Sequence, residues 1–368
     1  MPTPADKEMI EALEAVMDPI FQRPMLSLGM LEDVIRTGSG ASMTVRLSAP
    51  SRTVQAQIRE ALEQALMPLG VTALQIKWDL QVPTRTLSGE DPAPSVRNVV
   101  AVLSGKGGVG KSTCAANVAM ALARAGAKVG LLDADIYGPS VPTLFGVMEH
   151  PTSSDGKKIT PIERFNVKLM SIGFLTEDPK EAVVWRGPML HTALMQFLRD
   201  VNWGELDYLV LDLPPGTGDV ALSLSKHVSM TGAVVITTPQ EVALQDVYKA
   251  VSMCTKLSLP ILGIVENMSH FVDSGGVHHH IFGAGGGQKV AEFARAPLLA
   301  QLPIDPKVAE WGDKGVPLVQ AQPDSPSAAA FSKLAEDLAI RIAELHFERG
   351  GSQKAPKSEA TKHLKVLR

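Results

Sequence analysis

A glycine-rich stretch, SGKGGVGKST at residues 104–113, constrains the fold of this chain more than any other feature. It follows an apolar run, VVAVL, and precedes TCAANVAMALARAG, which has the composition of a helix. Residues 105–112 fit the pattern G-x-x-x-x-G-K-[ST] without a gap, in the strand-to-helix context that this pattern requires. Such a loop turns backbone N–H groups toward phosphate oxygens at the N-terminus of a helix. The sequence therefore predicts a nucleotide-binding α/β domain.

Short apolar runs alternate with longer helical patterns from Val99 onward. Strands are expected at VVAVLS, AKVGLLD, DYLVLDLP, GAVVITT, PILGIVEN and PLLAQLP. Runs that are apolar on both faces and separated by helices are typical of a mainly parallel sheet covered by helices on both faces. Residues 99–347 are therefore predicted to form a P-loop NTPase domain, with a last long helix, SAAAFSKLAEDLAIRIAELHFER, packed against its core.

The segments on either side of this domain differ from it in composition. Residues 1–80 combine strand-like SMTVRLSA and VTALQIKWDL with helical TVQAQIREALEQALMPLG, which predicts a small α+β domain. Residues 81–98 are rich in proline, serine and charge without an apolar period, so we expect a linker. Residues 348–368 are polar, basic and aperiodic, and we expect a disordered tail.

Charge and hydropathy exclude several classes of function. The net charge of -4 gives no whole-molecule attraction to nucleic acid or to an acidic membrane surface. No segment reaches the roughly 20 apolar residues that span a bilayer, and the N-terminus lacks a secretory signal, so a cytoplasmic protein is expected. The chain has two cysteines, Cys114 and Cys254, both within helical patterns and expected to be small buried side chains.

Ligands for phosphate and magnesium can be assigned from the motif and from two strand ends. Lys111 is expected to neutralise the β and γ phosphates, and the Ser112 hydroxyl to bind Mg²⁺. Asp133 and Asp135 end one strand and Asp212 ends another, at the sheet edge where open α/β folds bind ligands. Asp212 is the candidate for the Mg²⁺ shell and Asp135 for orienting the attacking water, although either could instead cap a helix or turn. The predicted ATP contacts of the loop are Gly105, Lys106, Gly107, Gly108, Val109, Gly110, Lys111, Ser112 and Thr113.

Three consecutive histidines, His278, His279 and His280, lie in the glycine-rich stretch VENMSHFVDSGGVHHHIFGAGGG. Neutral imidazole is a common ligand of transition metals. In an extended segment, however, the middle ring points away from its neighbours, so a metal site would need a turn or ligands from elsewhere. A solvated loop is the alternative interpretation.

The glycine-rich motif carries an additional lysine, Lys106, and SGKGGVGKST is a deviant Walker A motif. It is shared by partitioning ATPases, the nitrogenase iron protein and the Mrp/ApbC family of iron-sulfur cluster carriers. The flanking sequences DADIYGPSVPTLFG, VVWRGPML, WGELDYLVLDLPPGTGDV, TTPQEVALQDV and IFGAGGG resemble the Mrp/ApbC family. This resemblance covers residues 97 to about 345, and residues 5–80 resemble the iron-sulfur-assembly domain that precedes the ATPase in many members.

The resemblance implies a homodimer that binds ATP with Mg²⁺, hydrolyses it slowly and delivers a [4Fe-4S] cluster, bridged between subunits, to apoproteins or assembly factors. It also implies that Lys106 of one subunit reaches the phosphates bound by the other. Asn267 matches the position that recognises adenine in related ATPases, although a turn residue at the end of a strand is the alternative.

The chain departs from the family where members carry Cys-x-x-Cys, between ENMS and IFG. This chain has HFVDSGGVHHH there, so Asp273 and the three histidines are the remaining candidate ligands, and histidine does replace cysteine at some irons. Three hypotheses follow: a cluster carrier with non-cysteine or partner-supplied ligands, a nucleotide-switched adaptor that no longer binds a cluster, and an ATPase positioned on a surface by its basic tail.

Overall fold

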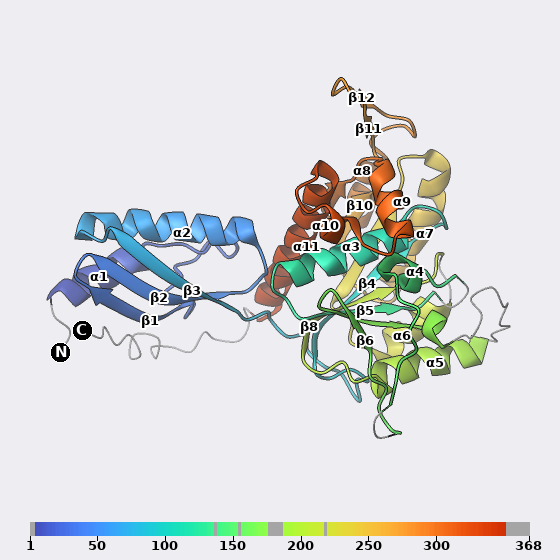
Figure 1. The fold of residues 1–368 in the computed structure, drawn as a ribbon, viewed down its shortest axis with the longest axis horizontal. Coiled ribbons are helices and arrows are strands. Elements are labelled where there is room, and N and C mark those ends of the chain that lie inside the picture. The colour runs from blue at the N-terminus through green and yellow to red at the C-terminus, as the bar shows by residue number, and fades with distance from the viewer. Residues whose placement is uncertain (1–3, 136–137, 154–155, 176–186, 217–218, 351–368) are drawn as a thin grey trace. The chain divides into compact units, whose positions relative to one another are not determined.

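The computed structural model describes residues 4–135, 138–153, 156–175, 187–216 and 219–350. The chain divides into two compact units, shown in Figure 1. The first holds the residues up to Pro83 together with the chain from Ala339 onward, and the second holds Thr84–Leu338. The predicted tail from residue 351 onward, and much of the VVWRGPML segment, lie outside the described residues.

The first unit is a three-stranded sheet packed against helices, the α+β arrangement that was expected. The strand order is β1-β2-β3, with β1 antiparallel and β3 parallel to the central β2. Helix α2 buries Val54, Ile58, Leu62 and Leu66, one side chain per turn, and its N-cap Ser51 accepts a hydrogen bond from Val54 N. The elements are α1 (Pro4–Glu14), β1 (Leu31–Thr37), β2 (Gly40–Leu47), α2 (Arg52–Leu66), the 3₁₀ turn η1 (Met67–Leu69) and β3 (Ala73–Leu80).

The second unit is built on an eight-stranded sheet of order β13-β10-β9-β4-β8-β5-β7-β6. Every pairing is parallel except that of β6 with β7 at one edge. All six predicted strands are present, which confirms the fold class, whereas β6 and β7 were not predicted. The strands are β4 (Val96–Ser104), β5 (Val129–Asp133), β6 (Ile162–Arg164), β7 (Val167–Ser171), β8 (Leu206–Asp212), β9 (Gly232–Thr237), β10 (Ile261–Glu266) and β13 (Leu298–Gln301).

Helices flank this sheet, as Figure 1 shows. Alternate residues of β4, including Ala101 and Leu103, pack in one apolar cluster with Phe197 of α5 and Leu224 of α6. Helix α3 contacts β4, β5 and β8, and its side chains do not join that cluster, so it covers the other face. The helices are α3 (Lys111–Arg124), α4 (Val141–Phe145), α5 (Gly187–Asp200), α6 (Asp219–His227), α7 (Glu241–Lys256), α8 (Gly286–Ala294), α9 (Pro306–Asp313), α10 (Leu318–Ala321) and α11 (Pro326–Gly350), with a 3₁₀ turn η2 (Ile172–Phe174) and a hairpin of β11 (Phe271–Val272) and β12 (His278–His279).

Three neighbouring strands position the candidate site. The order β4-β8-β5 places the end of β4, which leads into the glycine-rich loop, beside the ends of the other two strands. Asp133 of β5 lies opposite Asp212 of β8 in the parallel register. Because the carboxyl ends of parallel strands share one edge, the loop and both carboxylates meet there.

The structure differs from the expected linker at residues 81–98. Residues from Thr84 belong to the second unit, and β4 begins at Val96. The Arg85 guanidinium forms two hydrogen bonds to the Asp91 carboxylate, 2.5 and 2.9 Å, and another, 2.9 Å, to Ser229 O. Both charged side chains are almost completely buried, 3% and 1% exposed. A segment rich in proline and charge is therefore fixed to the domain through a buried ion pair and its hydrogen bonds. Such a pair produces no apolar periodicity in the sequence, so the sequence analysis could not detect it.

The last helix, α11, serves both units. Its first half buries Ala328, Phe331 and Leu334 in the second unit, as predicted. From Ala339 onward it belongs to the first unit, where the Phe347 ring stacks on Phe21 at a centroid distance of 4.4 Å. Although α11 has 25 residues, none of the helices in the described ranges is long and apolar enough to cross a membrane.

We predict that Arg85→Met lowers the free energy of unfolding by about 3–5 kcal/mol, because it leaves the Asp91 carboxylate buried without its counter-charge. The control is Lys249→Met, which removes an exposed ion pair with Asp246 and should cost less than about 1 kcal/mol. Denaturant unfolding measures both, and equal losses in the two variants would contradict the prediction.

The difference in unfolding free energy between the parent and Arg85→Met should depend on pH. Burial acts to raise the pKa of Asp91, but the hydrogen bonds from Arg85 and from the backbone N–H groups of Ser229 and Ala93 outweigh it and hold the pKa below the usual range. A depressed carboxyl pKa contributes stability above the unfolded value of about 4 and loses it as the pH falls. The difference between parent and Arg85→Met should therefore narrow below about pH 4.

Candidate functional site

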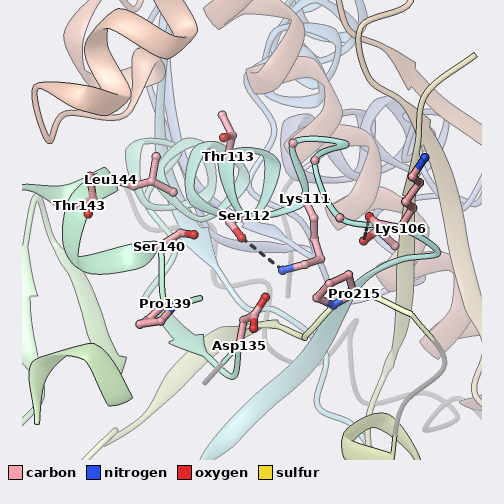
Figure 2. A pocket seen from close by; sticks show the side chains of 14 residues that line it. Lys106, Lys111, Ser112, Thr113, Asp135, Pro139, Ser140, Thr143, Leu144 and Pro215 are labelled. Carbon is pink, nitrogen blue, oxygen red and sulfur yellow. Dashed lines mark hydrogen bonds between the residues drawn. The ribbon is translucent and has the colours of Figure 1, made fainter. Parts of the chain in front are cut away.

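The glycine-rich loop lines a cavity of about 440 Å³ at the carboxyl edge of the sheet. Figure 2 shows the residues that line it: Lys111, Ser112 and Thr113 at the start of α3, and Asp135, Ser140 and Leu144 from the segment that follows β5. Backbone atoms of Gly107, Gly108 and Gly110 complete the wall on the loop side. This is the one place among the described residues where the predicted phosphate-binding side chains face a common space.

Close contacts require glycine, without a side chain, at two positions of the loop. A Cβ atom on Gly105 would lie 2.3 Å from the backbone nitrogen of Val247 in α7. A Cβ atom on Gly110 would lie 2.3 Å from Asn267 Nδ2, and Gly110 also has a φ of +80° as the N-cap of α3. Residues with a side chain are strongly disfavoured in this left-handed conformation. The loop is thus fixed from outside by α7 and by the end of β10.

Asn267 braces the loop. Its Nδ2 donates a 2.9 Å hydrogen bond to Val109 O, and its backbone N–H donates to Thr237 O at 2.8 Å. The residue is 8% exposed. The described contacts of its amide nitrogen are therefore with the loop, which adds a structural role to the adenine recognition expected from the sequence.

Lys111, which lines the cavity, forms a buried ion pair with Asp212, and their side chains are 6% and 0% exposed. The ammonium also donates to the Ser112 hydroxyl at 3.2 Å, as the dashed line in Figure 2 shows. Burial raises the pKa of the Asp212 carboxyl, and the charge of Lys111 opposes that shift. Asp212 Oδ2 is buried and accepts no hydrogen bond from the described residues. Lys111, Ser112 and Asp212, which the sequence analysis assigned to phosphate and Mg²⁺, therefore lie next to one another.

The two aspartates that follow β5 have different surroundings. The buried Asp133 carboxylate accepts hydrogen bonds from the backbone N–H groups of Asp135 (3.1 Å), Ser140 (2.9 Å) and Val141 (3.1 Å) and from the Ser171 hydroxyl (3.1 Å). Burial, with the charge of Asp212 adding to it, raises the pKa of Asp133 to about 7. Asp135 is only partly buried and lines the cavity. Asp133 therefore shapes the turn, and Asp135 is the carboxylate available to a ligand.

Lys106 is exposed at the mouth of the cavity. In Figure 2 its side chain points away from Lys111. The two lysines of the motif thus face different surroundings, one inside the domain and one on its surface.

The histidine-rich segment forms a short antiparallel hairpin, with Phe271 opposite His279 and Val272 opposite His278. Asp273 organises its turn: Oδ1 accepts from Gly275 N (2.8 Å) and Val277 N (3.0 Å), and Oδ2 contacts His279 Nε2 (2.7 Å). The hydrogen bond from His279 is the main cause that lowers the pKa of Asp273. Asp273 and His279 therefore pair with each other.

A fourth histidine, His270, was not predicted as part of this cluster. Its ring stacks on His278 at a centroid distance of 4.6 Å and lies 6.4 Å from the ring of His280. The hairpin brings His278 back beside His270, and this proximity was not evident from their separation of eight residues along the chain. Within the described ranges, no three histidine, cysteine or acidic side chains are already arranged to hold a metal ion. The four predicted ligands, Asp273 and His278–His280, are near one another but do not form a ready site.

Comparison with known proteins gives two family matches. Residues 95–339 match the model described as NUBPL iron-transfer P-loop NTPase, and residues 6–73 match that of an iron-sulfur cluster assembly protein. Proteins named iron-sulfur cluster carrier from Deinococcus radiodurans and Synechocystis are 46% and 43% identical to this chain. The alignments cover 91% of this chain in both cases, and 95% and 97% of the relatives. The similarity therefore extends over both units.

Solved structures show the same fold for the second unit. A nucleotide-binding protein of Archaeoglobus fulgidus in complex with ADP is 37% identical, with a TM-score of 0.55, over 64% of this chain and 91% of that one. The cell division ATPase MinD of Pyrococcus furiosus is 27% identical, with a TM-score of 0.50, over 66% of this chain and 98% of that one. These similarities place the cavity in a fold that binds nucleotides.

We predict that Gly110→Ala lowers the free energy of unfolding of the nucleotide-free protein by about 2 kcal/mol or more. The new methyl group strains the left-handed backbone and displaces Asn267 from Val109. Gly107→Ala is the matched control, because a Cβ there meets nothing within 4 Å, and it should cost less than about 1 kcal/mol. Adding Asn267→Ala to Gly110→Ala should recover part of the loss. Equal free energies of unfolding for Gly110→Ala and Gly107→Ala would show that the close approach of Asn267 to Gly110 is unimportant.

Proposed function

The chain belongs to the iron-sulfur cluster carrier family of P-loop NTPases, and on that basis we propose that it binds ATP with Mg²⁺ in the cavity, hydrolyses ATP slowly and delivers iron-sulfur clusters to apoproteins in the cytoplasm as a homodimer. The observation that carries the nucleotide part is that Lys111 and Ser112 line that cavity, with Asp212 as the buried partner of Lys111 directly behind them.

The loop binds the triphosphate. Backbone N–H groups from Gly105 to Thr113 face phosphate oxygens at the start of α3, where the helix dipole favours negative charge. Lys111 supplies a positive charge to the β and γ phosphates. Asn267 holds the loop through Val109 and presents its amide to the adenine.

Mg²⁺ fits the donors at this site. They are hard oxygen atoms, the Ser112 hydroxyl and the Asp212 carboxylate, and the buried Asp212 Oδ2 has no protein partner in the described residues. When bound, the ion neutralises charge on the phosphates. Asp135, which also lines the cavity, orients the attacking water by accepting a hydrogen bond from it.

Lys106 acts across the dimer. Its exposed side chain points away from its own Lys111, which supports a role at the phosphates bound by a second copy. A cation that arrives only when two subunits close would couple hydrolysis to dimer rearrangement.

The cargo cluster cannot use thiolates of this chain as it is folded. Both cysteines are buried, and burial raises the pKa of Cys114 to about 12 and that of Cys254 to about 11. The ligands must therefore come from other side chains or from a partner protein. The imidazoles of the β11–β12 hairpin are the candidates within the chain.

Hydrogen bonds determine which ring nitrogens are available. The Ser269 hydroxyl donates to Leu302 O at 3.0 Å, so it must accept from His270 Nδ1 at 2.8 Å. His280 Nδ1 donates to Ser269 O at 3.1 Å. Each ring therefore carries a hydrogen on Nδ1, and Nε2 is the nitrogen that a neutral ring would offer to iron; the second nitrogen is held as metal-binding histidines usually are. We place His270, His278 and His280 ahead of the Asp273–His279 pair as ligands.

Lys111→Ala should abolish ATP binding, measured by calorimetry, because the phosphates lose their buried counter-charge. Lys106→Ala should retain binding and lose turnover on the order of 100-fold. A mixture of Lys106→Ala and Asp135→Ala subunits separates the two modes of action. If Lys106 acts across the dimer, each mixed dimer regains one complete site, and random mixing restores about one quarter of the parent rate. No recovery in demonstrably mixed dimers would assign Lys106 to its own subunit.

Anaerobic reconstitution followed by iron and sulfide analysis tests cluster binding. A carrier should hold about four irons and four sulfides per dimer, with a charge-transfer absorption band. His270→Ala and His280→Ala should each lower that content, whereas His227→Ala, outside the hairpin, should not. Protein that hydrolyses ATP but never holds iron and sulfide would instead be the nucleotide-switched adaptor. Iron content that is insensitive to the hairpin variants would place the ligands elsewhere.

A further inference from the structure

The two edges of the three-stranded sheet in the first unit are built differently. β1 forms one edge, and its register with β2 shifts between Glu32 and Ile35, where Asp33 has a φ of +49°. A bulge of this kind bends an edge strand and interrupts its row of hydrogen-bonding groups. β3 forms the other edge (Figure 1), pairs with β2 over all eight of its residues without a shift, and contains no proline or glycine. Only the β1 edge therefore carries a feature that discourages pairing with another strand.

Alternate residues of β3 direct their backbone groups away from β2. Ala73 N donates to Ser39 O, and Gln81 N donates to Leu47 O at 2.8 Å. The odd-numbered residues of the strand therefore face β2. Since successive residues of a strand point their N–H and C=O groups in opposite directions, those of the even-numbered residues point to the open edge.

Three consecutive even-numbered residues leave this edge open. The Arg59 guanidinium donates to Leu74 O at 3.5 Å, so the first outward group already has a partner. The backbone groups of Ile76, Trp78 and Leu80 form no hydrogen bond with other described residues of the first unit. Their side chains are partly buried and pack against the core of that unit. The edge from 76 to 80 is thus a straight strand with an apolar face and unpaired backbone groups.

We propose that this edge binds the same edge of a second copy, in an antiparallel pairing centred on Trp78. The inference goes beyond the proposed function, because it gives the first unit a contact of its own that needs no nucleotide. Trp78 lies opposite its symmetry mate, and Ile76 lies opposite Leu80. The outward-pointing residues of the two copies then face one another, and each opposed pair exchanges two backbone hydrogen bonds. A two-fold contact of this kind uses the same patch on both copies.

Charge selects this register. The face of β3 away from the core carries Lys77, which is exposed, and Asp79, which is partly exposed. With Trp78 at the centre, Lys77 of each copy lies directly opposite Asp79 of the other, and opposite charges at such positions stabilise a sheet. Asp79 already accepts a hydrogen bond from Gln81 Nε2 at 2.7 Å, and a carboxylate can accept from a second donor as well.

The neighbouring registers are unfavourable. Only a centre on Lys77 or on Asp79 keeps outward-pointing residues opposed after the smallest shift. The first places Lys77 opposite Lys77, and the second places Asp79 opposite Asp79, so like charges repel in both. Because a contact over so few residues is marginal in strength, reversing one of these charges should be enough to break it.

Hydrogen exchange in the full chain tests the pairing at the outward N–H groups of residues 76, 78 and 80. These groups should exchange on the order of tenfold more slowly in the parent than in Lys77→Glu, in which like charges face one another. Lys77→Glu combined with Asp79→Lys should restore the slow exchange, because the reversed charges attract again. Lys7→Glu, which makes the same charge change on α1, should behave as the parent does.

Disulfide formation tests the register. A mixture of Lys77→Cys and Asp79→Cys subunits should form a covalent dimer under mild oxidation, since directly opposite residues of antiparallel strands lie within reach of a disulfide. Each variant by itself should form little covalent dimer. The parent should form none, because Cys114 and Cys254 are buried.

Exchange in the parent that is as fast as in Lys77→Glu would overturn the inference, and this comparison does not depend on any cysteine variant. A mixture that yields no covalent dimer, or no more than each variant alone, would also overturn it. In either case the proposed function is tested separately, because neither measurement reads the nucleotide site.

Discussion

The buried ion pair between Lys111 and Asp212 connects the two sequence motifs on which the site depends. Lys111 is the first residue of α3, and Asp212 is the last residue of β8, about one hundred positions later. A buried pair of this kind contributes little net stability, since removing both charges from water offsets much of their attraction. Its value lies in fixing where the helix begins relative to the sheet edge. The position of Ser112 and of the cavity wall formed by the loop follows from that alignment.

The end of β10 links this cavity to the histidine hairpin. Glu266, fully buried, accepts a hydrogen bond from Gln301 at 2.8 Å and another from Gly287 N at the start of α8. The next residue, Asn267, holds the loop through Val109, and the hairpin begins at Phe271. The loop and the hairpin therefore share one short, well-anchored segment. A movement of the loop on ligand binding would act on the hairpin through four residues rather than through the whole domain.

Periodicity and motif spacing predicted what depends on local sequence. Runs of residues that are apolar on both faces identified six of the eight strands of the large sheet. The glycine-rich motif gave the positions of Lys111 and Ser112. β6 and β7 were missed because a three-residue exposed strand and a five-residue partner give too short a pattern.

The Arg85–Asp91 pair was missed for a different reason: a buried charge depends on a partner and on backbone carbonyls that only the fold supplies. His270 was overlooked because proximity in a hairpin is a property of the turn, which Asp273 organises. Asn267 was assigned to adenine by its position in the sequence, and its hydrogen bond to Val109 could not be inferred from spacing.

The division of α11 between the two units has a consequence for how the protein is made. During synthesis the chain emerges from the N-terminus, and domains generally fold as their sequence becomes complete. The first unit includes residues from Ala339 onward, so the contact between Phe21 and Phe347 cannot form until almost the entire chain has been translated. The second unit, complete at Leu338, has all of its sequence before then. The Phe21–Phe347 contact can therefore form only after the sequence of the second unit is complete, and a gene fragment that ends near residue 83 encodes the first unit without the part of α11 that belongs to it.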